Sequence, residues 1–353
     1  MSDLTLGPGA QPPRPAALLP RPTWRLSWPF VSADGRLRVV WRVTLLLAGM
    51  LLVLALASGV LMAVVGLHLR YEPEGPADLD ASLFRRLPYW PLVVDVVALP
   101  FLVLLVWCFR RFLDRRSWRS LGFGPGPAPL CEAGVGLALG GAAILLSIVP
   151  LAFSGAVENA SARGSGVAEA AEPMGLLVVL GCLVAAAFVE ELVARAYILT
   201  NLRESLGPAV GVLISAAIFA GLHIWNPHVS ALAKVNILLA GLLLGGVFVL
   251  TGRLWMPWML HVSWNACQGV LLGLPASGLA MPSLFRLRLV GSDLATGGAF
   301  GLEGSLWNTV ALGAILSLVV VVGARRRRAT DGLGHDGAEG SEGTGFEKGQ
   351  VGG

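Results

Sequence analysis

The sequence predicts an all-α membrane protein, built as a polytopic bundle of about eight transmembrane helices. Of the 353 residues, 55% are hydrophobic and only 14% are charged, and the mean hydropathy is +0.72. A soluble domain carries about 25% charged residues. Apolar runs of about 20 residues recur along the chain, and a helix of that length crosses the ~30 Å hydrocarbon core. These observations together predict the fold class.

Each predicted span is an apolar run bounded by polar or turn-forming residues. The first, 43–67, contains no ionisable residue, whereas Asp95 and Pro100 interrupt the second. The fourth, fifth and seventh contain polar side chains within otherwise apolar sequence. The predicted spans are 43–67, 91–109, 133–153, 174–198, 208–226, 232–251, 254–274 and 306–324.

Arginines predict the orientation, because cytoplasmic loops of membrane proteins are enriched in Lys and Arg. They precede the first span, follow the second and end the last. They are Arg36, Arg38 and Arg42, then Arg110, Arg111, Arg115, Arg116 and Arg119, and finally Arg325 to Arg328. We expect a plasma-membrane protein with both termini in the cytoplasm. Contact of these arginines with lipid headgroups accounts for the net charge of +4, so we expect no nucleic-acid partner.

The chain ends differ in composition from the apolar middle. Residues 1–38 are Pro-rich and polar, and residues 329–353 are rich in Gly, Glu and Asp. Such segments lack the apolar content for a core, so we predict disordered cytoplasmic ends flanking a membrane domain at 39–328. Residues 1–35 contain no apolar signal-peptide core, so the first span should itself direct insertion.

The first polar motif is Glu190-Glu191-x-x-x-Arg195 in the fourth span. A charge at the centre of a membrane helix costs about 2.5–3.5 kcal/mol, so such residues usually line a cavity. Glu191 and Arg195 are spaced for an ion pair, while Glu190 points ~100° away and stays free. A carboxylate in a dry cavity suits proton transfer from water to a leaving amine. The alternative is that Glu190, Glu191 and Arg195 only serve helix packing and membrane topology.

The second and third motifs are Phe219-x-x-x-His223 and His261-x-x-x-Asn265. His223 would orient a water or bind a metal, or else form an interhelical hydrogen bond. His261 and Asn265 share one helix face, where two donors suit an oxyanion. With Glu190, the two histidines also permit a zinc site with an open position, although no H-E-x-x-H pattern demands one.

A shared site requires a particular helix arrangement. A fifth helix starting at Gly207 carries His223 ~24 Å along its axis, whereas His261 lies only ~10 Å into its own helix. We therefore predict that the fourth helix continues past Arg195 toward Leu202. The fifth helix should begin later than Gly207 or be strongly tilted.

All three motifs fall, in this order, between Glu190 and Asn265. Over residues 174–275 the chain resembles the CPBP intramembrane proteases, the CAAX prenyl endopeptidases and bacteriocin-processing enzymes also called Abi or lysostaphin-resistance-A-like proteins. That family usually has Gly after the motif Arg, where this chain has Ala196. The departure concerns helix packing and leaves the catalytic candidates in place.

The resemblance implies an intramembrane endopeptidase that acts on a peptide or protein substrate within lipid. It assigns water activation to Glu190 and His223, oxyanion stabilisation to His261 and Asn265, and structural support to Glu191, Arg195 and Phe219. No cofactor follows with certainty, and zinc stays an open alternative on Glu190, His223 and His261.

Two other functions fit the same sequence. A noncatalytic binding or bacteriocin-immunity protein would keep the fold without the reaction. A proton-coupled transporter would use the membrane Glu and His residues with Asp95 as a relay, although no repeated helix pattern suggests two related halves.

Overall fold

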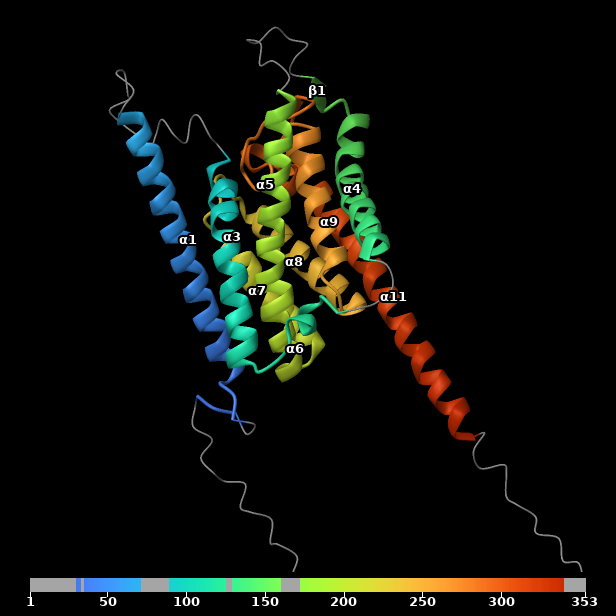
Figure 1. Cartoon of the computed structure of the whole chain (residues 1–353). Helices are drawn as coiled ribbons and strands as arrows, with labels where there is room; N and C mark the ends of the chain where they lie inside the picture. Colours follow the sequence, from blue (N-terminus) through green and yellow to red (C-terminus); the bar gives the residue numbers. More distant parts are fainter. Residues whose placement is uncertain (1–29, 33–34, 71–88, 125–128, 160–171, 340–353) are drawn as a thin grey trace, which may run out of the picture.

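In the computed structural model of the chain, α-helices pack side by side into a bundle (Figure 1). The structure describes residues 30–32, 35–70, 89–124, 129–159 and 172–339. A short antiparallel ribbon pairs β1 (Val157–Asn159) with β2 (Leu287–Leu289) at one end of the bundle. The predicted all-α polytopic membrane bundle is confirmed.

Within the described ranges, six helical segments are long and apolar enough to cross a membrane. Predicted spans 208–226 and 254–274 fall short of this. They correspond to α7 (Pro208–Leu222) and to α9 (Trp255–Asn265), which runs into the π-helix η5 (Ala266–Leu271). At 1.5 Å per residue, the 15 residues of α7 reach only roughly 22 Å. The predicted count of about eight spans is therefore not confirmed.

The remaining helices carry the predicted spans. They are α1 (Val39–Arg70), α3 (Trp90–Cys108), α4 (Pro129–Phe153), α5 (Pro173–Glu191), α8 (Ala231–Thr251) and α11 (Leu306–Glu339). α5 continues through the π-helix η4 (Leu192–Leu199) into α6 (Thr200–Leu206). The fourth helix thus extends past Arg195, as predicted. α7 begins at Pro208, directly after Gly207, and His223 is its C-cap residue. A strong tilt of this helix stays a prediction.

The chain ends fall partly outside the described residues. Most of the predicted disordered segment 1–38 lies there, as do residues 340–353. α11 continues to Glu339, past the predicted domain boundary at 328.

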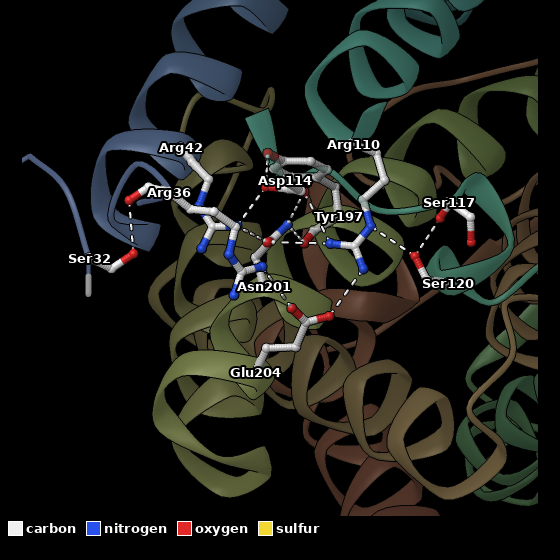
Figure 2. A network of polar contacts seen from close by, with 10 residues as sticks. All are labelled: Ser32, Arg36, Arg42, Arg110, Asp114, Ser117, Ser120, Tyr197, Asn201 and Glu204. Carbon is white, nitrogen blue, oxygen red and sulfur yellow. Dashed lines mark hydrogen bonds and ion pairs between the residues drawn. The ribbon is translucent and has the colours of Figure 1, made fainter. Parts of the chain in front are cut away.

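The arginine-rich regions all lie at the same end of the bundle (Figure 1). Two of these arginines are buried rather than placed in exposed loops: Arg42 is 4% exposed and Arg110 is fully buried. Figure 2 shows both converging on Asp114, at 2.6 Å from Arg42 and 3.0 Å from Arg110. Tyr197 and Asn201 also donate hydrogen bonds to the Asp114 carboxylate. This network ties α1 and α3 to the fourth helix.

α4 and α9 approach each other through glycines. A Cβ added at Gly140 would lie 2.8 Å from the Ser263 Cβ and closer still to the Leu260 carbonyl oxygen. Ser263 Oγ donates to the Leu137 carbonyl at 2.7 Å across the same interface. Because α9 carries the third motif, the close approach at Gly140 helps to set the depth of His261 and Asn265.

Gly140→Val is therefore expected to lower the stability of the bundle by about 1–3 kcal/mol or more, through overpacking against backbone. Gly134→Val is the matched control, since a Cβ at Gly134 meets nothing within 4 Å. Thermal unfolding in detergent measures both variants. Equal melting temperatures of the Gly140→Val and Gly134→Val proteins would contradict this packing.

Residues 272–305 fold back against the helices at the end opposite the arginines, where β2 pairs with β1 (Figure 1). We call this stretch the return segment. Its Phe300, Leu302 and Ser305 are fully buried. Asn236 of α8 donates to the carbonyl oxygens of Glu303 and Ser305 at 2.7 and 2.9 Å. The segment is thus anchored in the bundle and forms part of the cavity described below.

Candidate active site

Glu190, His223 and His261 meet at one point although they come from three helical elements. Glu190 Oε2 lies 3.5 Å from His223 Nε2 and 3.9 Å from His261 Nε2. The Glu190 side chain keeps 31% exposure, against 15% for His223 and 11% for His261. The structure therefore brings together the three ionisable residues that the sequence proposed for one site.

The His223 ring is oriented by its own helix. Its Nδ1 lies 2.8 Å from the Phe219 carbonyl oxygen. A carbonyl only accepts, so Nδ1 carries the proton and Nε2 is directed to Glu190. The Phe219 ring lies against the imidazole with 4.4 Å between ring centroids. The i,i+4 spacing of this motif thus fixes both the tautomer and the direction of the ring.

Glu191 and Arg195 form a buried brace, and both side chains have no exposed surface. Glu191 Oε1 accepts from Arg195 Nη1 at 2.8 Å and lies 3.0 Å from His261 Nδ1. The Arg195 guanidinium stacks 4.2 Å above the Phe219 ring. Nδ1–H of His261 therefore donates to Glu191, which leaves Nε2 facing Glu190. The ion pair follows from the sequence spacing, but the Glu191–His261 contact does not.

A small cavity lies between the second and third motifs. Apolar side chains such as Leu243, Leu244 and Leu260 form much of its wall. Its polar lining consists of His223, Asn236, His261, Asn265, Ser277, Glu303 and Asn308. The Asn265 amide makes no hydrogen bond with any described residue, so its donors are available to a group in the cavity.

Glu303, which belongs to none of the three sequence motifs, lies in the return segment and lines the same cavity. Burial raises the pKa of its carboxyl, while hydrogen bonds from Ser277 and Trp264 favour the carboxylate form. Its only signal in the sequence is one acidic residue in the apolar stretch from Phe300 to Trp307. Asp95, half-buried on α3, interacts electrostatically with Glu190 and His223.

The zinc alternative requires three donor side chains that can reach one metal ion. Among the residues that the structure describes, no group of three or more His, Cys, Asp or Glu side chains is arranged to hold a metal ion. Glu190, His223 and His261 therefore do not form a ready ligand set in this arrangement.

Comparison with known proteins supports the family resemblance. Residues 172–267 match the family model of the Rce1-like type II CAAX prenyl endopeptidases. No curated protein and no solved structure matches the chain. The matched range contains all three motifs and confirms the resemblance predicted from them. Residues 172–267 are therefore similar to the Rce1-like type II CAAX prenyl endopeptidases.

Proposed function

We propose that the protein is an intramembrane endopeptidase that hydrolyses peptide bonds with a water molecule activated by Glu190 and His223. The observation that supports this most strongly is the Oε2 atom of Glu190. It is buried and makes no hydrogen bond with any described residue, yet it faces two imidazole nitrogens at 3.5 and 3.9 Å. Such distances are long for direct hydrogen bonds, and a water that enters between these groups would gain Oε2 and an imidazole nitrogen as partners.

The reaction would begin with this water. Glu190 accepts a proton from it while His223 holds it in line, and the oxygen attacks the carbonyl carbon of the scissile bond. The carbonyl oxygen becomes an oxyanion. Glu190 then passes the proton to the leaving nitrogen, the C–N bond breaks, and a carboxylate and an amine are released. Glu190 returns to its starting state without a covalent intermediate.

His261 and Asn265 would stabilise the oxyanion. The His261 Nδ1–H is held by Glu191, so its Nε2 is directed into the cavity, where a proton on this nitrogen would be donated to the oxyanion. The Asn265 amide supplies the second donor from the next turn of the same helix. Both residues line the cavity with His223, so a carbonyl carbon next to the water would have its oxygen near these donors.

Asn265→Ala is expected to lower kcat by about 10²–10³-fold with little change in KM, as loss of one oxyanion donor does elsewhere. Ser263→Ala is the matched control on the same helix. Ser263 faces α4, where its hydroxyl bonds Leu137, and it does not line the cavity. The measurement is steady-state peptide cleavage by both variants. Equal kcat values would exclude Asn265 as an oxyanion donor.

The proposed setting is the plasma membrane with the arginine-rich end in the cytoplasm. The even number of spans in the described ranges is consistent with both termini on that side. The substrate would be a peptide or membrane-associated protein that reaches the cavity between helices.

Cleavage of a quenched peptide library, lipidated and unlipidated, by the purified full-length protein tests the function. We expect cleavage of a subset of peptides that persists when a metal chelator is added. Loss of cleavage with chelator would favour the zinc mechanism instead. An absence of cleavage across both libraries would favour the noncatalytic binding protein.

A further inference from the structure

We infer that Glu303 is a positioning residue of the active site that locks together the two elements carrying His223 and His261. This inference rests on the proposed function, because it concerns the geometry in which that reaction occurs. Glu303 lies outside the family-matched range 172–267, so the match assigns it no role.

One oxygen of the Glu303 carboxylate holds α9. Trp264 Nε1 donates to Glu303 Oε1 at 2.9 Å. Trp264 is adjacent to Asn265 and one helical turn from His261, so its indole fixes the part of α9 that carries both proposed oxyanion donors. Removing this acceptor would leave a buried indole N–H without a partner.

The other oxygen holds the turn that follows His223. Glu303 Oε2 accepts from the backbone N–H of Ser277 at 2.7 Å and from its hydroxyl at 3.0 Å. Ser277 has a positive φ of 50°, an uncommon conformation for a residue other than glycine. Its carbonyl in turn accepts from Asn226 Nδ2 at 3.3 Å. Asn226 lies three residues after His223, so the chain of bonds runs from α9 to the end of α7.

The backbone of Glu303 is anchored separately. Its carbonyl oxygen accepts from Asn236 of α8 at 2.7 Å and from Asn308 of α11 at 3.1 Å. The carboxylate is therefore presented from a fixed point, and a change to its side chain leaves this anchor in place.

Only a carboxylate satisfies all three donors. Trp264 donates to one oxygen and Ser277 donates twice to the other, whereas a glutamine offers one acceptor oxygen and a donor amide. Glu303→Gln must therefore break the bond to Trp264 or the bonds to Ser277. Glu303 also faces His223 electrostatically, as do Glu190 and Asp95.

The first test is a double-mutant cycle on kcat with Glu303→Gln, Trp264→Phe and the double variant. We expect each single variant to lower kcat by about 10–100-fold, as small misplacements of reacting groups do, with KM little changed. Both variants interrupt the same contact, so the double variant should lose little more than the worse single one. Ser277→Ala keeps the backbone donor and should retain most of kcat.

Glu204→Gln is the matched control for loss of a carboxylate, because Glu204 pairs with Arg110 at the opposite end of the bundle. It should leave kcat unchanged. Unchanged kcat in Glu303→Gln, or fully additive losses in the double variant, would overturn the inference while cleavage by the wild type upheld the proposed function.

Hydrogen exchange supplies a readout that does not need activity. Peptides covering residues 255–271 should exchange faster in Glu303→Gln and Trp264→Phe than in Glu204→Gln. If the wild type cleaves no peptide, the proposed function fails. Faster exchange in Glu303→Gln and Trp264→Phe would still support the role of Glu303 in holding α9 in place. Equal exchange in all variants would overturn the inference on its own.

Discussion

Glu190→Gln is expected to lower kcat by about 10²–10⁴-fold, the range typical of a lost general acid–base. Glutamine has almost the same shape but cannot accept a proton from water at neutral pH. Since Glu190 Oε2 makes no hydrogen bond with any described residue, the substitution breaks no hydrogen bond of that oxygen. The measurement is steady-state cleavage of the best peptide by the variant and the wild type in the same detergent.

The control for Glu190→Gln is its thermal midpoint, which should match that of the wild type. A variant that cleaves at the wild-type rate would exclude Glu190 as the base. A variant that loses both activity and stability would mean that Glu190 has a structural role, and the assignment to catalysis would fail.

Arg195→Met is expected to cost about 3–5 kcal/mol of stability, because it leaves the Glu191 carboxylate buried without its cation. Neither side chain has exposed surface, and the guanidinium also covers the Phe219 ring. The variant should lose activity as well, since Glu191 orients His261. Thermal or denaturant unfolding in detergent measures the first effect and peptide cleavage the second.

The double variant Glu191→Gln with Arg195→Met is the matched control. It removes both charges, so it should recover much of the stability lost in Arg195→Met, and the glutamine oxygen can still accept from His261. If the double variant is less stable than Arg195→Met, the loss does not come from an unpaired Glu191 charge.

Local spacing and the cost of burying charge pointed to Glu190, His223 and His261, which lie close together in the structure. The i,i+4 pairs Glu191–Arg195 and Phe219–His223 form in the structure as the sequence indicates. Contacts between motifs could not be predicted in this way. The Glu191–His261 bond spans 70 positions in the sequence and depends on how α5 and α9 pack. Glu303 was missed because nothing in its local sequence distinguishes a return segment from an exposed loop.

The predicted count of about eight spans was not confirmed for a related reason. Hydropathy measures composition, and apolar composition continues beyond the ends of two short helices. α7 ends at Leu222, and η5 widens the helix after Asn265, although neighbouring residues are still apolar. Likewise, the arginines predicted a cytoplasmic end, yet hydropathy could not show that Arg42 and Arg110 are buried around Asp114.

A single-turnover cleavage experiment in heavy-oxygen water tests the central claim most directly. Wild-type protein and Glu190→Gln would be compared in the same lipid vesicles, with enzyme in excess over a peptide that the library identified. We predict that the wild-type product carries one heavy oxygen in its new carboxylate, and that Glu190→Gln forms almost no product. Labelled product formed equally fast by Glu190→Gln would contradict water activation by Glu190.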